Sequence, residues 1–198
     1  MPSGYLALVL HAHLPFVRHP EHEHFLEEDW FFEAITETYI PLLQTMQRLA
    51  GDGVPFKLTM SLTPTLCAML QDELLRDRYV QHIDLLIDLS RREIRRNRDD
   101  PQLEELAKFY FEIFSKSRRF FVDEWNCDLL AAFRQLRNTG ALEIIACAAT
   151  HGLLPIIHQQ SPAAARAQVL IGRDAYVEAF DADPFRWPNT ARATRCVF

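Results

Sequence analysis

The sequence lacks the features that mark several specialised classes of protein. No apolar run approaches the 18 residues or so of a membrane-spanning helix. No charged segment followed by an apolar stretch opens the chain as a secretory signal would. Internal repeats and low-complexity segments are missing as well. We therefore expect a cytoplasmic globular protein that does not bind membranes.

Cysteine is scarce and scattered. The chain has four cysteines without a CxxC pair, and three of them fall in apolar segments: Cys67, Cys127, Cys147 and Cys196. Zinc sites and disulfide frameworks need characteristic cysteine spacings, so we expect neither. Buried thiols in a reducing compartment are the better interpretation.

An excess of positive charge is missing too. The formal net charge is −6, and the densest basic segment, residues 91–98, lies late in a helical pattern. Positive charge at that end complements the helix dipole, so we do not expect nucleic-acid binding. The chain has 198 residues, 48% of them hydrophobic, enough for one domain or for part of a larger one. Its oligomeric state is not indicated.

The most informative segment that is present combines an apolar run with two histidines. Residues 5–10 have the character of a buried strand and are followed by His11, His13 and Pro15. Pro15 ends the strand because it has no amide hydrogen to donate. Two side chains at positions i and i+2 of an extended backbone point the same way, and α/β folds build their sites at the carboxyl ends of strands. We therefore expect His11 and His13 to converge on one ligand.

Two interpretations of this histidine pair are open. Neutral imidazole is a common zinc ligand, so one is a metal-dependent hydrolase or deacetylase using His11 and His13. The other is a polar pocket without a metal, which is favoured because no aspartate or further histidine stands nearby at a metal-ligand spacing. His19, His22 and His24 lie in a charged run that we interpret as a solvated loop rather than a metal-binding tract.

The pattern that follows predicts a strand, a helix and a second strand. Apolar residues recur with a helical period over residues 29–49, and the helix ends at the glycines of residues 51–53. Residues 55–62 alternate enough for a strand, and Thr63 with Pro64 is typical of a helix start. A crossover through a helix predicts that the two strands are parallel.

From about residue 73 to residue 137 the sequence shows only helical patterns, over residues 79–96, 102–123 and 124–137. This segment is too long for a simple crossover, so we interpret it as a helical excursion from a barrel or open sheet. A third strand is predicted at residues 142–149.

His151 comes just after this third strand, following Thr150, as His11 follows the first strand. Successive parallel strands bring their carboxyl ends to the same edge, so we expect His11, His13 and His151 to lie together. A last helix is predicted to open at Ser161, with a clear pattern over residues 168–180.

Four blocks of the sequence, taken in order, resemble the family 57 glycoside hydrolases, and within them the branching-enzyme group that acts on α-1,4-glucans. They are residues 8–17, which contain the motif HxHxP, residues 33–43, residues 62–66 and residues 140–152. Together they extend over nearly everything up to about Pro184. The motif HxHxP is a weak signal alone, whereas four blocks in register are specific.

The resemblance implies an α/β fold in which residues 1–184 form the amino-terminal part of an incomplete (β/α)7 barrel, with a helical insertion at about 73–137. It implies retaining chemistry on an α-1,4-glucan such as amylose or glycogen, as in glycogen biosynthesis, with no metal or cofactor. His11, His13 and His151 would line the sugar subsite and exchange hydrogen bonds with glucose hydroxyls. The nucleophilic glutamate and the acid/base aspartate of the family are expected beyond this chain, so no catalytic residue is assigned within it.

The chain departs from the family pattern after Pro184. There the family continues to Leu-Pro-Glu or a close variant. Residues 185–198 instead are rich in arginine, have no helical or strand period, and contain no glutamate. The last glutamate is Glu178. We interpret the tail as aberrant, unstructured and the result of a frameshift, and we expect the chain to be inactive because the nucleophile is lost.

No other carboxylate is expected to replace the missing pair. Retaining glycosidases hold two carboxyl groups about 5 Å apart, whereas the eight extended steps from Glu143 to His151 would span about 26 Å at ~3.3 Å each. Glu143 is therefore expected at the opposite end of the barrel. Glu27, Glu28 and Asp29 lie in the charged run after the first strand and are expected to be solvated.

Trp30, beside that run, has two open interpretations, a stacking surface for a sugar ring or a packing residue of the core. The function favoured by all of these observations is a fragment of a 1,4-alpha-glucan branching enzyme. The alternative from another class is a non-catalytic glucan-binding protein or pseudoenzyme, for which the same residues would serve.

Overall fold

The computed structural model of the protein describes Gly4 and residues 6–184. The chain groups into two compact units. Among the described residues, the first unit, the sheet unit, contains Gly4 and residues 6–16, Met46–Leu70 and residues 130–184, and the second, the helical unit, contains Val17–Thr45 and Gln71–Leu129. The tail of residues 185–198, which the sequence analysis interprets as aberrant, lies outside the described residues. Over the described part of the chain, no helix combines the length and apolar character needed to cross a membrane.

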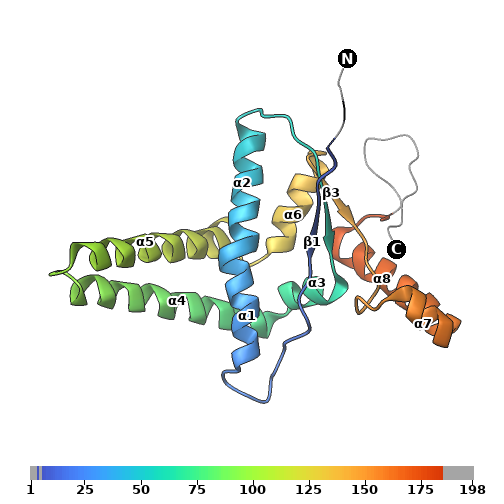
Figure 1. The fold of residues 1–198 in the computed structure, drawn as a ribbon, viewed down its shortest axis with the longest axis horizontal. Helices are drawn as coiled ribbons and strands as arrows, with labels where there is room; N and C mark the ends of the chain where they lie inside the picture. Colours follow the sequence, from blue (N-terminus) through green and yellow to red (C-terminus); the bar gives the residue numbers. More distant parts are fainter. Residues whose placement is uncertain (1–3, 5, 185–198) are drawn as a thin grey trace. The chain divides into compact units, whose positions relative to one another are not determined.

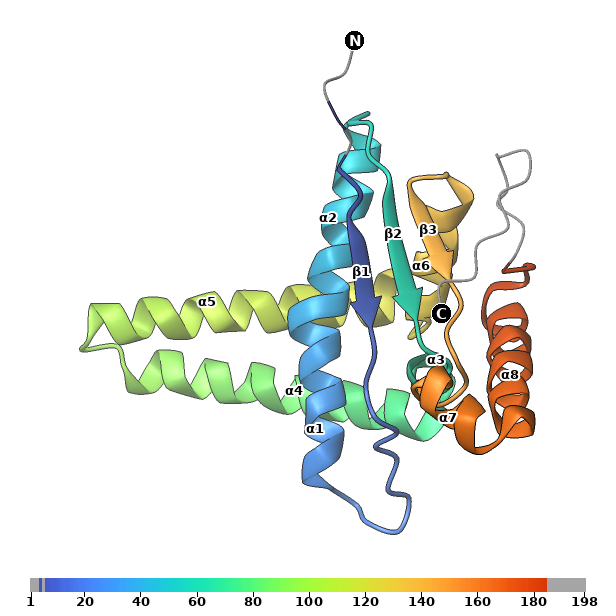
Figure 2. The same cartoon turned by 45° about the vertical axis from the view of Figure 1, so that its right-hand side comes forward.

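The sheet unit is built on three parallel strands in the order β1-β2-β3 (Figure 2). Their bounds are Val9–Ala12 for β1, Leu58–Leu62 for β2 and Leu142–Ile145 for β3. The unit also holds α3 (Pro64–Gln71), α6 (Leu129–Asn138), α7 (Leu154–Gln160) and α8 (Pro162–Phe180). The last residue of α3 and the first residue of α6 are assigned to the helical unit. The helix α2 (Ile40–Gly51) begins in the helical unit and ends in the sheet unit. The predicted parallel pairing is confirmed, and α7 is a helix that the sequence analysis did not predict.

The core of the sheet unit is formed by apolar side chains of the strands, which pack against apolar side chains of the flanking helices. Met60 and Leu62 of β2 are almost fully buried, as is Leu142 of β3. Helix side chains complete this core, among them Leu66, Met69, Phe133, Tyr176 and Phe180. Burial of such aliphatic and aromatic groups is the main stabilising term for a sheet of this size.

The first strand lies further along the chain than residues 5–10, where the sequence analysis placed it. Its ladder pairs Val9 with Thr59 and Ala12 with Leu62. Because the pairing partner β2 fixes this register, His11 is part of the strand and does not follow it. The two histidines still leave the same edge of the sheet.

The third strand ends at Ile145, four residues earlier than predicted, because the backbone that follows contacts α8 and not another strand. Ala149 donates its N–H to the carbonyl of Gln168 at 3.0 Å. A Cβ added at Gly172 would lie 2.1 Å from the carbonyl oxygen of Cys147, so only glycine permits this approach. A ladder partner for residues 146–149 is thus replaced by contacts with a helix.

The helical unit consists of a helix with a π-helical turn and a long helical hairpin (Figure 1). The first is α1 (Leu26–Ala34), continued by the π-helix η1 (Ile35–Tyr39) into α2. The hairpin is α4 (Glu73–Arg96) and α5 (Pro101–Arg118), continued by the π-helix η2 (Arg119–Glu124). Asp72 and Asp100 cap the two hairpin helices, since each side chain accepts hydrogen bonds from the first-turn amides.

Tyr79 of α4 lies at the centre of this unit. Its ring is fully buried and meets the Phe121 ring edge to face with centroids 4.7 Å apart. Its hydroxyl is satisfied by Thr36 Oγ1 at 2.9 Å, as buried tyrosine hydroxyls require. Burial raises the pKa of Tyr79 well above its usual value. The hydroxyl therefore stays protonated at physiological pH.

Two predictions for this region are wrong. A helix over residues 124–137 was expected, but α6 begins only at Leu129, because Asn126 and Cys127 have φ values of 46° and 60°, in the left-handed region that interrupts a helix. Glu28 was expected to be solvated, but it is 1% exposed and its carboxylate accepts hydrogen bonds from the Arg78 guanidinium at 2.6 and 2.7 Å. The partner of this buried carboxylate is thus an arginine 50 positions away in the sequence.

Candidate functional site

The candidate site is a cluster of three imidazole rings in the sheet unit. The ring centroids of His11 and His13 are 5.9 Å apart, those of His11 and His151 4.5 Å, and those of His13 and His151 4.4 Å. The prediction that these three histidines lie together is confirmed. We call His11, His13 and His151 the histidine cluster.

The first two rings are positioned by the alternation of β1 and the segment after it. Ala12, between them, is 3% exposed and points into the core, so His11 and His13 both emerge on the opposite face. His11 remains exposed and His13 is half-buried. The cluster is therefore open to solvent and accessible to a ligand.

The neighbouring strand β2 and the residue directly after it supply a hydroxyl to each of these rings. Ser61 Oγ lies 2.5 Å from His11 Nδ1, and Thr63 Oγ1 lies 3.1 Å from His13 Nδ1. Both hydroxyl residues are buried, Ser61 at 5% exposure and Thr63 at 0%. The sequence analysis did not identify them. Their spacing of two residues, at the carboxyl end of a strand parallel to β1, is the signal that would have found them.

The third ring is carried by a turn that α8 holds in place. His151 donates its backbone N–H to the carbonyl of Ala148 at 3.0 Å and has a φ of 56°, in the left-handed region. The side-chain amide of Gln168 binds Thr150 twice, accepting from its backbone N–H and donating to its hydroxyl, each at 2.9 Å. This double contact stabilises a backbone conformation that is unfavourable for a residue with a Cβ.

His11 and His151 share a hydrogen bond between their Nε2 atoms, 3.1 Å apart. One of these nitrogens donates and the other accepts, so at least one ring is neutral. Partial desolvation of the ring, followed by the charge of His151, lowers the pKa of His11. The same causes, with the charge of His11 added, lower the pKa of His13. The rings of His11 and His13 are therefore neutral at neutral pH, and each carries one N–H and one nitrogen with a lone pair.

The remaining residues singled out in the sequence lie elsewhere. Trp30 belongs to α1 of the helical unit and is 53% exposed, so it is not a core residue. Glu143 is the second residue of β3, where its carboxylate accepts a hydrogen bond from Thr59 Oγ1 at 2.7 Å. It lies toward the amino end of the strand, away from the edge that carries His151, as predicted.

No group of three or more histidine, cysteine or acidic side chains is arranged to hold a metal ion in the part of the chain that the structure describes. Among those residues, Cys67, Cys127 and Cys147 are free thiols. Burial raises the pKa of Cys67 to about 12, so this thiol stays protonated. Cys196 falls outside the described residues.

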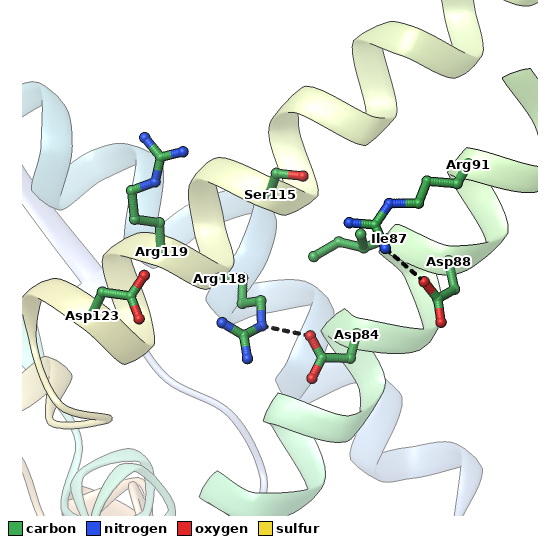
Figure 3. Close-up of a pocket in the computed structure, with 8 residues that line it drawn as sticks. All are labelled: Asp84, Ile87, Asp88, Arg91, Ser115, Arg118, Arg119 and Asp123. Atoms are coloured by element: carbon green, nitrogen blue, oxygen red, sulfur yellow. Dashed lines mark hydrogen bonds and ion pairs between the residues drawn. The ribbon is translucent and has the colours of Figure 1, made fainter.

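The helical unit has a pocket of its own, with a volume of about 540 Å³, between α4 and the segment from α5 to η2 (Figure 3). Three arginines and three aspartates line it together with Ile87 and Ser115. Arg118 donates to Asp84 at 2.5 Å and Arg91 donates to Asp88 at 3.0 Å. Most of the lining charges are thus paired with each other, and we assign these pairs to the stabilisation of the hairpin.

The sequence profile of glycosyl hydrolase family 57 matches residues 7–198. The chain belongs to glycosyl hydrolase family 57. This confirms the resemblance inferred from the four sequence blocks. The match also runs through residues 185–198.

Individual members of family 57 are similar to this chain over most of its length. The 1,4-alpha-glucan branching enzyme of Thermococcus kodakarensis is 35% identical over 185 residues, which are 92% of this chain and 26% of that protein. The crystal structure of the α-amylase AmyC from Thermotoga maritima has a TM-score of 0.85 and 42% identity, covering 90% of this chain and 34% of AmyC. The branching enzyme from Pyrococcus horikoshii has a TM-score of 0.83 and 34% identity, covering 92% of this chain and 33% of that one. The chain thus spans about a quarter to a third of the length of these family members.

Proposed function

We propose that this chain is the amino-terminal part of a 1,4-alpha-glucan branching enzyme and that its histidine cluster binds an α-1,4-glucan such as amylose or glycogen. The observation that carries the proposal is the convergence of three imidazole rings, 4.4–5.9 Å apart, at the carboxyl edge of a parallel sheet. Such an edge is where α/β folds bind ligands. In this proposal the three strands belong to an incomplete (β/α)7 barrel.

Neutral imidazoles suit a sugar because their hydrogen-bonding groups match those of a hydroxyl. Each ring has one N–H donor and one lone-pair acceptor, and each glucose hydroxyl both donates and accepts. The lowered pKa values of His11 and His13 keep this donor and acceptor pair intact at neutral pH. The role of the cluster is to position the glucose ring at the bond to be cleaved. The exposed ring of Trp30 is proposed as a second sugar contact, through stacking.

The reaction that this domain would serve begins with cleavage of an α-1,4 linkage. A glutamate then carries the glucosyl group as an ester and passes it to a 6-hydroxyl of another glucan. Retaining chemistry needs a nucleophile and an acid/base that act as one unit. The sequence contains no glutamate after Glu178. We therefore propose that the chain as written binds glucan without turning it over.

A second candidate reaction is hydrolysis, favoured by the 42% identity with the α-amylase AmyC. Both reactions share the cleavage step and differ only in the acceptor, which is water for hydrolysis and a glucan hydroxyl for branching. A non-catalytic glucan-binding role would use the same cluster. We propose a cytoplasmic location in each case, since the free thiols of Cys67, Cys127 and Cys147 suit a reducing compartment.

The binding proposal is tested by calorimetric titration of the 198-residue chain with maltoheptaose. His13→Ala removes one hydrogen-bonding side chain, worth about 0.5–1.5 kcal/mol, so the affinity should fall about two- to tenfold. His158→Ala is the matched control, because His158 is exposed on α7 of the same unit and outside the cluster. Equal affinities of the two variants, or no binding by the unsubstituted chain, would overturn the proposal.

The proposed lack of turnover is tested with amylose and iodine. The absorbance of the iodine complex should stay constant when amylose is incubated with the pure protein. New α-1,6 linkages would show branching activity, and new reducing ends without such linkages would show hydrolysis. Either product would contradict the statement that the chain is inactive.

A further inference from the structure

Three hydroxyl and carbonyl groups form a chain behind the His13 ring. Thr65 Oγ1 donates to the carbonyl oxygen of Leu14 at 3.2 Å, and Thr63 Oγ1 lies 3.1 Å from Thr65 Oγ1. Thr63 Oγ1 in turn lies 3.1 Å from His13 Nδ1. All of these groups belong to the sheet unit. Because each hydroxyl has only one proton, the carbonyl at the end of this series fixes the direction of every hydrogen bond in it.

The carbonyl oxygen of Leu14 can only accept a hydrogen bond, so the Thr65 hydroxyl donates its one proton to it. The contact between the two threonines then needs the proton of Thr63, which must donate to Thr65 Oγ1. Thr63 is left with lone pairs alone, and one of them receives the backbone N–H of Leu66 at 3.4 Å, as in a helix N-cap. The remaining lone pair faces His13 Nδ1, so this nitrogen must carry the hydrogen.

We propose that Thr65, acting through Thr63, fixes His13 in the tautomer with hydrogen on Nδ1, so that Nε2 is an obligatory hydrogen-bond acceptor. No hydrogen bond from the described residues reaches His13 Nε2. This nitrogen is therefore available to accept a donating hydroxyl. The identity of that hydroxyl as one of a glucose residue rests on the proposed function. Thr63 and Thr65 are positioning residues in this scheme, since neither contacts the sugar.

His11 provides a contrast within the same site. Its Nδ1 atom lies 2.5 Å from Ser61 Oγ. A serine hydroxyl both donates and accepts, so this hydrogen bond can run in either direction. Thr65 has no part in it, and the tautomer of His11 serves as an internal reference.

The tautomers are read from the ¹⁵N chemical shifts of the two ring nitrogens in long-range ¹H–¹⁵N correlation spectra. The spectra are recorded at about pH 8, where unperturbed histidine is neutral. We expect His13 of the unsubstituted chain to carry its hydrogen on Nδ1. Thr65→Val keeps the side-chain volume but removes the acceptor of the Thr63 proton. That proton should then turn to His13 Nδ1, and the hydrogen of the ring should move to Nε2.

Two further variants separate this effect from a general disturbance. Thr65→Ser keeps the hydroxyl and should restore the tautomer of the unsubstituted chain. Thr139→Val is the matched control, because Thr139 also donates to a backbone carbonyl, that of Leu136 at 2.7 Å, in the same unit. It should leave both His13 and His11 unchanged. Affinity for maltoheptaose should fall about two- to tenfold in Thr65→Val alone, as for one lost hydrogen bond.

The inference is overturned if His13 of the unsubstituted chain carries its hydrogen on Nε2, a result that needs no variant to fold. It is also overturned if His13 in folded Thr65→Val keeps its hydrogen on Nδ1. Absence of maltoheptaose binding, with the tautomers as expected, would instead overturn the proposed function but not the inference about the His13 tautomer. The spectroscopic and binding measurements thus test the two proposals separately.

Discussion

His11 and His151, 140 positions apart in the sequence, share a hydrogen bond between their Nε2 atoms at 3.1 Å. Such a bond exists only while one of the two nitrogens keeps its lone pair. Protonation of both rings breaks the bond and brings two positive charges together. The arrangement of the rings in the candidate site therefore depends on pH.

We predict that acid destabilises the sheet unit. Burial and the neighbouring histidines lower the pKa values of His11 and His13, whereas unfolded histidine titrates near its ordinary value of about 6.5. Between the lowered and the ordinary values the unfolded chain binds more protons than the folded chain, so the stability falls as the pH drops through this window. Above about pH 7 this contribution is constant.

Urea unfolding between about pH 8 and about pH 5, together with an NMR titration of both rings, measures this effect. The double variant His11→Gln and His13→Gln should lose part of the pH dependence. If the variant and the unsubstituted chain lose the same free energy of unfolding on acidification, the histidine cluster is not its source.

We predict that Gly172→Ala destabilises the sheet unit by about 1–3 kcal/mol, the usual cost of forcing an added carbon into a packed contact. The new Cβ would meet backbone atoms, the Cys147 carbonyl at 2.1 Å and the Ala149 nitrogen at 3.3 Å, which no side-chain rotation relieves. Gly51→Ala is the control, because a Cβ there has no neighbour within 4 Å. Denaturant unfolding of both variants decides the prediction. A Gly172→Ala protein as stable as Gly51→Ala would show that α8 shifts freely.

We predict that Glu28→Ala destabilises the helical unit by about 3–5 kcal/mol, the cost of leaving a buried partner charge without its counterion. Arg78 is 11% exposed in its side chain and would lose both carboxylate contacts. Arg96→Ala breaks an ion pair with Glu93 that is largely exposed, and should cost less than about 1 kcal/mol. Equal unfolding free energies for these two variants would contradict the prediction.

We predict that the chain associates with itself through β1. This strand is an edge of the described sheet, and Leu6, Leu8 and Val9 are exposed by 94%, 51% and 59%. Exposed apolar edges favour pairing between molecules, and a lysine on the edge opposes it. Val9→Lys should therefore lower the mass measured by light scattering at high protein concentration. Val54→Lys, which changes an exposed valine outside the strands, should leave it unchanged.

Local sequence was enough to predict the features that depend on one segment of chain. The i, i+2 spacing places His11 and His13 on one face of an extended backbone whatever the rest of the fold does. Thr63 with Pro64 and Ser161 with Pro162 mark helix starts because a side-chain oxygen and a proline act within the first turn.

Features that depend on two distant segments were predicted less well. Glu28 was expected to be solvated, since its partner Arg78 lies 50 positions away. The third strand was predicted to be too long, because the contacts of α8 with residues 147–149 are not visible in the strand pattern. Trp30 as a sugar contact and residues 185–198 as an aberrant tail stay predictions.

The sequence by itself determined the family, the parallel strands and the identity of the three histidines, because alternation, helix caps and motif blocks are properties of short segments. The tertiary structure alone decided how those histidines behave. Ser61 and Thr63 meet the His11 and His13 rings only when β2 pairs with β1 in the observed register. The Nδ1 atoms of both rings thus meet hydroxyls 50 positions away in the chain, because a hydrogen bond depends on contact in space and not on neighbourhood in sequence.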